Sequence, residues 1–447
     1  MFLKVKNIDN IGGTVEAPPS KSYSHRAIII SSFANGVSRI FNPLISEDTE
    51  ASIKVCKCLG ANIEYIKNED NNYLKIIGTE KIENLSKKPI DLKNSGTTLR
   101  IMTSIAGLSK NKVLLTGDNS LKNRPMEIFL NALKPLGINI KSMKGNGKPP
   151  IIVESGFIGG KTSIEGNVSS QFISSILISG AISKNGVELE IKGDFVSKPY
   201  VKMTLDVMKK FGVNVEVKES ENESLEFDKD DSIFFIVKPQ KYYSSDFIVE
   251  GDYSSASYIL SAVAILGGKI TIKNLFKDSK QGDKLILEIL KKMGANIIAI
   301  EDSITLVSDG KLNGIDINLS DAPDLLPTVA VLGSLAEGRT RITGVKHGRF
   351  KETDRIKMCT LELKELECEV KEFDDGMEII GGVNSGIVNS HKDHRLAMAF
   401  SLIGLKYDIL VEDGEVFDIS FPNFIEAMSE IGVDLELHKN KLLKRND

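Results

Sequence analysis

The sequence has few cysteines, and their spacing excludes two common uses of this residue. Four cysteines among 447 residues are too few for the disulfide framework of a small secreted protein. Cys56 and Cys58 are two positions apart, but no second Cys or His pair follows at zinc-finger spacing. We therefore expect all the cysteines to be thiols in helices or in the core.

Membrane and nucleic-acid partners are not expected either. No apolar run approaches the ~18 residues of a membrane span, and the N-terminal stretch MFLKVKNIDN lacks the apolar core and cleavage site of a signal peptide. The formal net charge of −4 gives no general attraction to nucleic acid or anionic lipid. We expect a cytoplasmic protein, in which anion binding must come from local clusters of cations.

The chain does contain a weak internal repeat. Six segments share a β-like run, an amphipathic helical stretch and a second β-like run, and they close as LGANI, LGINI, FGVNV, MGANI, LECEV and IGVDL. Each is longer than a solenoid repeat of roughly 20 to 50 residues, so each is interpreted as a small α/β subdomain. Three precede and three follow the polar stretch KPQKYYSSD, which is the expected boundary between two domains.

Each repeat also contains a helix candidate that is apolar on nearly all sides, which is typical of a helix buried inside a domain. These candidates span residues 25–34, 97–108, 169–181, 254–266, 322–336 and 393–405. Sheets are therefore expected on the outside of each domain, with helices inside.

Polar residues gather where these apolar helices begin. In APPSKSYSHRAIIISSFANG, a helix starting near Ser24 would leave N–H groups that attract an anion, and Lys21 and Arg26 would strengthen the attraction. Taken alone, this stretch is more typical of a Ser N-cap with two solvated cations. Similar residues stand at the other five starts, however: Asn94, Ser95, Gly96 and Thr97; Ser169, Ser170 and Gln171; Asp252, Ser254 and Ser255; Asp324; and Asp393, His394 and Arg395.

Nine motifs stand in the order seen in 5-enolpyruvylshikimate-3-phosphate (EPSP) synthases: PPSKSYSHR, NSGTTLR, NRPM, VSSQF, SKPYV, VEGDYSSASY, PDLLPT, FKETDR and DHRLAMAFSL. The sequence therefore resembles this family from about Lys21 to Pro422. The resemblance implies an α/β fold, a two-domain inside-out α/β barrel, with three βαβαββ repeats per domain and buried helices that point their N-termini at the interdomain cleft. It also implies a first domain of residues 21–241 and a discontinuous second domain of 1–20 plus 242–447.

The reaction implied by the resemblance is transfer of the enolpyruvyl group of phosphoenolpyruvate to the 5-hydroxyl of shikimate 3-phosphate, with release of phosphate, in aromatic amino acid biosynthesis. It needs acid and base groups but no metal or cofactor. We expect a monomer whose partners are these two substrates.

The resemblance also assigns residues. Glu352 is expected to exchange a proton with the methylene carbon and Asp324 with the 5-hydroxyl, while Lys21 serves as a further donor between the substrates. The residues expected to bind shikimate 3-phosphate are Lys21, Ser22, Arg26, Ser169, Ser170, Gln171, Ser197, Asp324 and Lys351. Those expected to bind phosphoenolpyruvate are Lys21, Gly96, Arg124, Gln171, Arg355 and Arg395.

Two positions depart from the family pattern. Ile419 stands where many relatives have a Lys that reaches the phosphate of phosphoenolpyruvate, which predicts weaker binding of that substrate. His347 aligns approximately with an Asn near the shikimate phosphate. Gly96 agrees with the pattern, and it predicts sensitivity to glyphosate, an analogue that occupies the phosphoenolpyruvate site.

Two other interpretations are considered. The enolpyruvyl transferases that act on UDP-N-acetylglucosamine share this architecture, but they usually have Lys-Asn in place of Lys21-Ser22 and a reactive Cys in the loop that here reads GDNSLKNRPM. A non-catalytic repeat scaffold would not explain why charged residues gather at the starts of buried helices, where an unpaired charge is costly.

Overall fold

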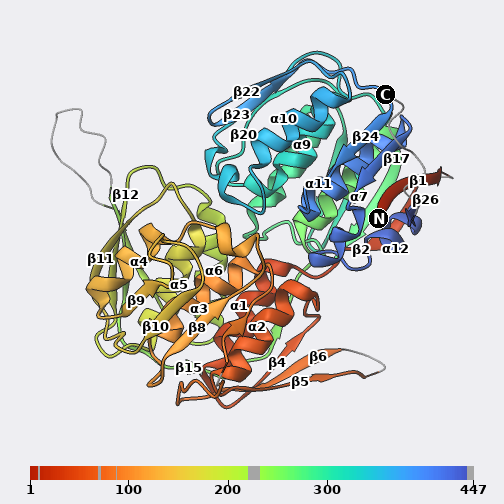
Figure 1. Ribbon diagram of the computed structural model, residues 1–447. Helices are drawn as coiled ribbons and strands as arrows, with labels where there is room; N and C mark the ends of the chain where they lie inside the picture. The colour runs from red at the N-terminus through yellow and green to blue at the C-terminus, as the bar shows by residue number, and fades with distance from the viewer. Residues whose placement is uncertain (9–10, 69–71, 87, 220–231, 440–447) are drawn as a thin grey trace. The chain divides into compact units, whose positions relative to one another are not determined.

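The chain forms two compact units in the computed structural model, which describes residues 1–8, 11–68, 72–86, 88–219 and 232–439 (Figure 1). The central unit is Pro19–Val249, and the terminal unit combines Met1–Pro18 with Glu250–Asp447. Among the described residues, no helix is both long enough and apolar enough to cross a membrane.

The described part of the central unit contains three four-stranded sheets of one topology. In each sheet the first strand pairs in parallel with the second, and the remaining pairs are antiparallel. The strand orders are β16-β4-β6-β5, β7-β8-β10-β9 and β11-β12-β14-β13. The bounds are β4 Val37–Phe41, β5 Asn62–Ile66, β6 Tyr73–Ile77, β7 Ile90–Asp91, β8 Val113–Thr116, β9 Asn139–Ser142, β10 Ile151–Glu154, β11 Gly160–Glu165, β12 Val187–Lys192, β13 Glu216–Glu219, β14 Ile233–Val237 and β16 Phe247–Ile248.

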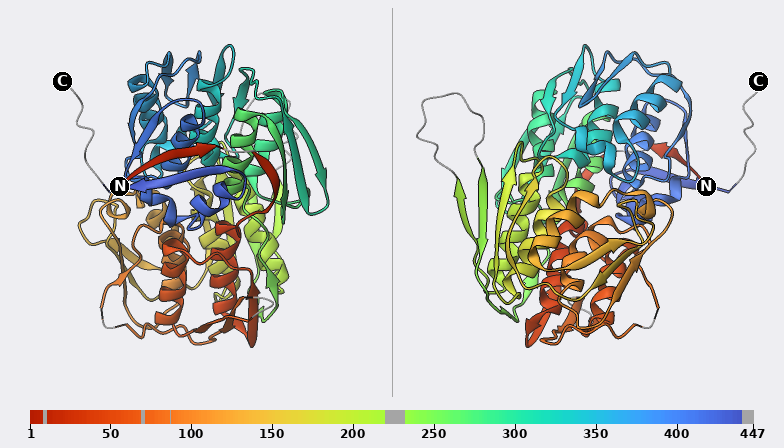
Figure 2. Two further views of the ribbon diagram at one scale, coloured as in Figure 1. Left: turned by 90° about the vertical axis from the view of Figure 1, so that its right-hand side faces the viewer. Right: turned by 60° about the vertical axis from the view of Figure 1, so that its left-hand side comes forward.

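The strands of the central unit lie around its apolar helices (Figure 2). These helices, α1 Lys21–Ser32, α3 Gly96–Ala106 and α5 Ser170–Ala181, are buried along nearly their whole length. Three further helices bury one face only: α2 Glu47–Cys58, α4 Glu127–Leu133 and α6 Lys198–Lys210.

The first helix begins earlier than the sequence predicted. It starts at Lys21, not near Ser24, because Ser20 takes the N-cap position and its side chain accepts from the backbone N–H of Tyr23. Ser24 is buried within the helix, where its hydroxyl accepts from the backbone N–H of Leu44 at 2.9 Å. Lys21 therefore lies in the first turn, beside the N–H groups that a helix start leaves unpaired.

The terminal unit repeats the same topology. Its described sheets have the orders β2-β17-β19-β18, β20-β21-β23-β22 and β24-β25-β1-β26, again with a parallel first pair. The strand bounds are β1 Phe2–Ile8, β2 Gly12–Glu16, β17 Gly268–Lys273, β18 Asn296–Ile300, β19 Ser303–Ser308, β20 Asp316–Asn318, β21 Thr340–Thr343, β22 Val370–Phe373, β23 Gly376–Ile379, β24 Gly386–Asn389, β25 Ile409–Glu412 and β26 Val433–His438.

Its apolar helices are also buried. They are α7 Tyr253–Leu266, α9 Leu326–Ser334 and α11 His394–Ser401, and the outer ones are α8 Ile286–Lys292, α10 Arg355–Glu365 and α12 Phe424–Ser429. The prediction of six buried helices in a mixed α/β chain is therefore confirmed. No ladder among the described strands joins the three sheets of a unit into a closed barrel.

Strand pairing decides where the chain passes from one unit to the other. β2 pairs in parallel with β17, so the N-terminal strands belong to the terminal unit up to Pro18. The second passage follows Val249, beyond the predicted switch at Lys241, because β15 Tyr242–Tyr243 pairs with β3 Ala34–Asn35 and β16 pairs with β4. Tyr242 is buried, and its hydroxyl donates to the carbonyl of Ile178 at 3.1 Å.

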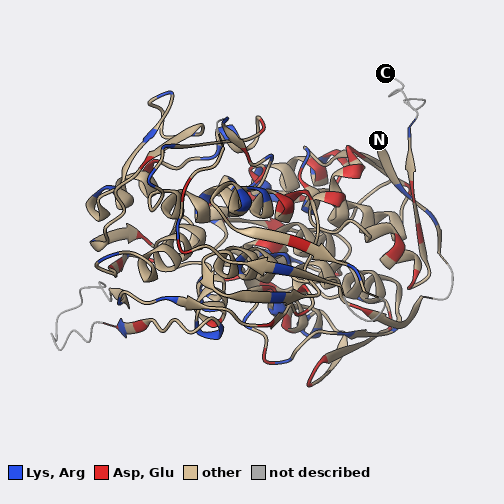
Figure 3. Cartoon of the chain, turned by 90° about the horizontal axis from the view of Figure 1, so that it is seen from below, with Lys and Arg blue, Asp and Glu red and all other residues tan. Residues whose placement is uncertain are grey.

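The cysteines agree with their predicted role. Cys56, Cys359 and Cys368 are buried, Cys58 is half-buried at the end of α2, and all are free thiols. Lys and Arg occur among Asp and Glu along the chain (Figure 3), as the small net charge requires. Any strongly anion-attracting site must therefore be local.

Candidate functional site

The buried helices begin with polar side chains, as predicted. In the part of the chain that the structure describes, five of the six are capped by a side chain that accepts a backbone N–H: Ser20, Ser95, Ser169, Asp252 and Asp393. The sixth, α9, follows a 3-10 turn, Pro323–Leu325, which contains Asp324. The start of each buried helix therefore carries a polar side chain. It can hydrogen-bond a ligand or orient a neighbouring side chain that binds one.

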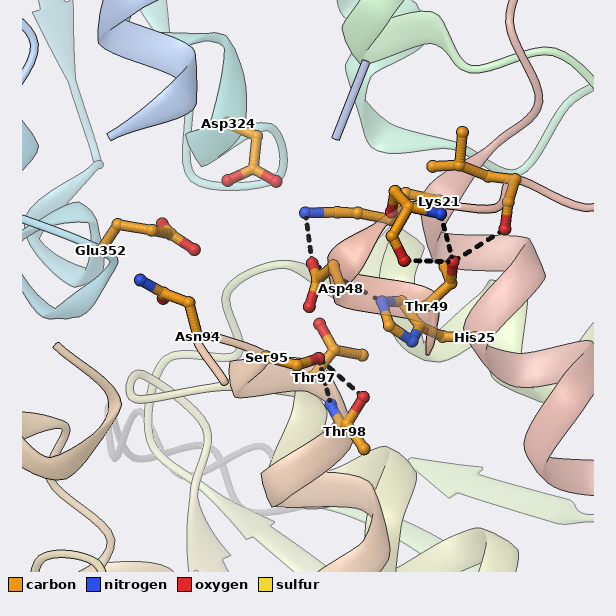
Figure 4. A network of polar contacts seen from close by, with 12 residues as sticks. Lys21, His25, Asp48, Thr49, Asn94, Ser95, Thr97, Thr98, Asp324 and Glu352 are labelled. Carbon is orange, nitrogen blue, oxygen red and sulfur yellow. Dashed lines mark hydrogen bonds and ion pairs between the residues drawn. The ribbon is translucent and has the colours of Figure 1, made fainter. Parts of the chain in front are cut away.

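In the central unit, Lys21 forms an ion pair with a carboxylate that the sequence did not single out (Figure 4). Its Nζ lies 2.9 Å from Oδ2 of Asp48, in the first turn of α2, and Nε2 of His25 lies 3.6 Å from the same oxygen. Burial raises the pKa of Asp48, but Lys21 and His25 outweigh burial and hold that pKa well below its ordinary value. Burial lowers the pKa of His25, so its imidazole is neutral near pH 7.

Gly96 makes room for the guanidinium of Arg124. A Cβ atom at position 96 would lie 2.0 Å from Nη1 of Arg124, so the guanidinium would have to shift. Nη2 of Arg124 donates to the side-chain carbonyl of Asn94, just before α3. The predicted pair of phosphoenolpyruvate ligands, Gly96 and Arg124, is thus in direct contact, and any larger residue at position 96 would displace the guanidinium.

The side-chain amide of Gln171 is held on both sides. Its Oε1 accepts from Nη1 of Arg100 at 2.8 Å, and its Nε2 donates to Oγ1 of Thr97 at 2.8 Å. Arg100 also donates to Oγ of Ser169 at 3.3 Å, and its guanidinium lies 5.2 Å from the ring centre of Phe172. Two predicted ligands, Gln171 and Ser169, are therefore oriented by an arginine to which the sequence assigned no role.

Arg26, which is predicted to bind shikimate 3-phosphate, donates hydrogen bonds within the protein. Its guanidinium is 1% exposed and donates to Oγ1 of Thr204 at 2.7 Å and to the carbonyls of Ser22 and Tyr200 at 2.9 Å each. Burial lowers its pKa to about 10, which still leaves it charged. These bonds tie α1 to α6, and binding of shikimate 3-phosphate by Arg26 stays a prediction.

Ser197 stands at the N-cap position of α6 in a strained conformation. Its φ of 56° and ψ of 33° place a non-glycine residue in the left-handed region, which costs roughly 1 kcal/mol or more. Such strain is typical of residues whose position matters for function. The remaining predicted ligands of the central unit, half-buried Ser22 and buried Ser170, lie in the first turns of α1 and α5.

In the terminal unit, Arg355 joins three carboxylates. It is the first residue of α10 and only 1% exposed. It donates to Oδ1 of Asp324 at 2.7 Å, to Oε2 of Glu352 at 2.6 Å, and to Asp393 at 2.8 and 3.2 Å. Burial alone would lower the pKa of Arg355, but Asp393, Glu352 and Asp324 raise it, so the guanidinium stays charged. The two residues predicted to transfer protons are thus bridged by one guanidinium.

Asp324 has further cationic partners. Its Oδ2 accepts from Nη2 of Arg395 at 2.9 Å, and its Oδ1 lies 3.4 Å from Nζ of Lys351. His347, which departs from the family pattern, lies close to this cluster. Burial, followed by the charge of Lys351, lowers the pKa of His347 to about 4. His347 is therefore neutral near pH 7 and adds no cation to this cluster.

Asp283 is a further acidic group that the sequence did not indicate. It lies in the 3-10 turn Gly282–Leu285 and accepts a hydrogen bond from the hydroxyl of Ser254 at the start of α7. Burial, together with the charge of Asp324, raises its pKa to about 6. A lone Asp after a connector gives no signal in the sequence, whereas Asp393 stands out by its place at the start of a buried helix.

The comparisons with known proteins agree with one another. The family model described as EPSP synthase (3-phosphoshikimate 1-carboxyvinyltransferase) matches residues 5–428. A protein named 3-phosphoshikimate 1-carboxyvinyltransferase from Methanobrevibacter smithii is 60% identical over 446 residues, covering 98% of this chain and 100% of the relative. One of the same name from Methanothermobacter thermautotrophicus is 52% identical over 437 residues, with 98% and 100% covered. A solved structure of EPSP synthase from Acinetobacter baumannii has a TM-score of 0.78 at 26% identity, covering 98% of this chain and 99% of that one.

Proposed function

The chain belongs to the EPSP synthase family, and on that premise we propose which of its side chains perform each part of the reaction. The protein is a 3-phosphoshikimate 1-carboxyvinyltransferase, which transfers the enolpyruvyl group of phosphoenolpyruvate to shikimate 3-phosphate. Both substrates are polyanions, which accounts for local clusters of cations on a chain of net negative charge.

We propose that hydroxyl groups and helix N–H groups of the central unit hold shikimate 3-phosphate. The ligands are Ser169, Ser170, Gln171 and Ser197, with Lys21 and Ser22 from α1. Arg26, which also donates to the carbonyls of Ser22 and Tyr200, is a further ligand. Serine hydroxyls and unpaired N–H groups at a helix start suit a phosphate, because they donate hydrogen bonds without steric bulk. The fixed amide of Gln171 supports this assignment, since a ligand held in one rotamer loses little entropy on binding.

We propose that arginines grip phosphoenolpyruvate. Arg124, Arg355 and Arg395 present planar guanidinium groups that match carboxylate and phosphate oxygens, and Lys21 adds a point charge. In the structure Arg355 and Arg395 both donate to Asp324. A substrate anion must therefore share these donors with the carboxylates that act on it, which keeps acid, base and substrate within one network.

The observation that carries the mechanism is the pairing of Asp324 and Glu352 with the single guanidinium of Arg355, at 2.7 and 2.6 Å. Asp324 accepts the proton of the 5-hydroxyl while the oxygen of that hydroxyl bonds to C2 of phosphoenolpyruvate. Glu352 gives a proton to the methylene carbon of phosphoenolpyruvate. Glu352 then takes a proton back from the methyl group of the adduct. The double bond reforms, the C2–O bond to phosphate breaks with its electrons on the leaving phosphate, and Asp324 passes its proton to that phosphate, which restores both carboxyl groups. Lys351, next to Glu352, completes the ligands of shikimate 3-phosphate.

Two substitutions separate the binding roles of the two ligand sets. Ser170→Ala is expected to raise KM for shikimate 3-phosphate about 10-fold, and Arg124→Lys to raise KM for phosphoenolpyruvate similarly, as expected for lost hydrogen bonds to charged groups. Ser179→Ala on the same helix α5 is the control, because its buried hydroxyl donates only within the helix, to the carbonyl of Ser175 at 2.8 Å and of Ile176 at 3.3 Å. The KM for each substrate is measured by steady-state kinetics with that substrate varied. The assignment would be contradicted if one substitution raised the KM values for both substrates together.

Ile419 tests the departure from the family pattern. It ends the 3-10 helix Gly414–Ile419 and is half-buried. Ile419→Lys is expected to lower KM for phosphoenolpyruvate about 10-fold by adding a charge-assisted bond to phosphate. Ile419→Met, of similar size and without charge, is the matched control, and an unchanged KM in the Lys variant would argue against a phosphate at this position.

The arrangement of the repeats is also proposed. We propose that the three repeats of each unit form an inside-out α/β barrel, and that the units are the two domains of the enzyme. The support is the common strand topology of the six sheets and the burial of the six apolar helices. That the enzyme is a cytoplasmic monomer stays a prediction.

A further inference from the structure

A chain of buried polar side chains runs from the start of α1 to the start of α3. Oδ2 of Asp48 contacts Lys21 at 2.9 Å and His25 at 3.6 Å. Nδ1 of His25 lies 2.9 Å from Oγ of Ser52, which lies 2.7 Å from Oγ1 of Thr98. Thr98 in turn lies 2.6 Å from Oγ of Ser95, the N-cap of α3. Figure 4 shows both ends of the chain, at Lys21 and at Ser95.

The direction of these hydrogen bonds depends on the tautomer of His25. His25 is completely buried, and the charged groups that act on it are Asp48, Lys21 and Arg26. Its imidazole is neutral and has one N–H, and ionised Asp48 can only accept, so we expect the tautomer whose N–H on Nε2 faces Asp48 at 3.6 Å. In that tautomer Nδ1 accepts from the hydroxyl of Ser52, and Ser52 accepts from Thr98. The hydroxyl of Ser95 lies against Thr98 and also bonds to Asp48.

We propose that His25 and Asp48 are positioning residues for Lys21, and that the chain from Ser95 through Thr98 and Ser52 fixes the ammonium group relative to the start of α3. The proposal rests on the proposed role of Lys21 between the substrates. The start of α3 carries Gly96, which contacts Arg124. This series of hydrogen-bonded side chains therefore fixes the positions of Lys21 and Arg124 relative to each other. Both residues are assigned to phosphoenolpyruvate.

A purely structural role is the alternative to this proposal. Burying an ion pair is costly unless its remaining hydrogen-bonding capacity is used, and a neutral histidine could serve Asp48 in this way alone. The position of Lys21 distinguishes the two roles. The hydrogen-bonded side chains lead to Lys21, a residue assigned to the substrates, which a purely structural role does not explain. A positioning role predicts losses in turnover that exceed any loss of stability.

The first test reads the tautomer of His25 directly. The chain has five histidines, so selective ¹⁵N labelling of histidine gives few signals, and His25→Gln assigns the one of interest. We expect a neutral imidazole with the proton on Nε2, and we expect Ser52→Ala to move the Nδ1 signal toward that of a free acceptor. Thr103→Val is the matched control, since Thr103 is a buried hydroxyl on α3 that bonds within its helix at 2.6 Å. A proton on Nδ1 would overturn the proposed direction.

The second test measures kinetics in folded variants. His25→Leu is expected to lower kcat about 10- to 100-fold, the effect of a misplaced catalytic group, with KM for shikimate 3-phosphate nearly unchanged. His25→Gln, which keeps a donor and an acceptor, is expected to recover most of the loss, and Thr98→Val to lower kcat while Thr103→Val does not. Equal activity of the Leu and Gln variants, or of the two Val variants, would overturn the proposal even if His25→Leu failed to fold.

These tests also separate the inference from its premise. If Lys21→Met kept full turnover, the proposed role of Lys21 would fail, whereas the tautomer expected for His25 would still be observed. If Lys21→Met lost turnover but the His25 variants did not, the catalytic assignment would stand and the positioning chain would be wrong.

Discussion

Glu352→Gln and Asp324→Asn are each expected to lower turnover by well over ~100-fold, the scale of general acid–base catalysis. Both substitutions keep the shape of the side chain and remove its ability to exchange a proton. Their hydrogen bonds to Arg355, at 2.6 and 2.7 Å, come from a guanidinium that can still donate to an amide oxygen. The loss should therefore appear in kcat, measured with both substrates saturating.

Glu365→Gln is the matched control for this prediction. Glu365 lies on the same helix as Arg355, at its C-terminal end, and is exposed. It is expected to keep the kcat of the unaltered enzyme. Near-normal turnover of Glu352→Gln or of Asp324→Asn would refute the proton-transfer role of that residue, whatever the control shows.

Gly96→Ala is expected to raise KM for phosphoenolpyruvate by about 30- to 100-fold, which corresponds to the loss of a hydrogen bond to a charged group. The added methyl group would lie 2.0 Å from Nη1 and 3.1 Å from Cζ of Arg124, so the guanidinium must move away. The effect should therefore fall on the substrate that Arg124 grips. Sensitivity of the unaltered enzyme to glyphosate stays a prediction of the same glycine.

A double substitution tests whether Gly96 acts through Arg124. If it does, Gly96→Ala combined with Arg124→Met should raise KM for phosphoenolpyruvate no further than Arg124→Met alone, because contacting residues are not additive. Fully additive effects would show that Gly96 acts on the ligand itself. That outcome would favour an interpretation in which the glycine lets the substrate approach the backbone.

Local patterns were enough to predict the buried helices and the polar residues at their starts. An apolar run such as HRAIIISSFA can be stable only inside a domain, and Ser or Asp before it caps a helix. The exact start of α1 was missed, because Ser20 and Ser24 are both plausible caps and only the contact between Ser24 and Leu44 distinguishes them.

Contacts between distant segments could not be predicted in this way. Asp48 acquires its role from α1, and Arg26 turns inward because Thr204 and Tyr200 accept from it. The pairing of β2 with β17 and of β16 with β4 depends on strands far apart in the sequence. A motif tells which residue types are present, but not which way a guanidinium faces.

The most direct test of the account is release of inorganic phosphate from phosphoenolpyruvate, measured with shikimate 3-phosphate in one reaction and UDP-N-acetylglucosamine in another. The family assignment and the Lys21-Ser22 pair predict release with shikimate 3-phosphate alone. Release with the nucleotide sugar alone would keep the fold and contradict the substrate, and release in neither reaction would contradict the proposed chemistry of the two clusters.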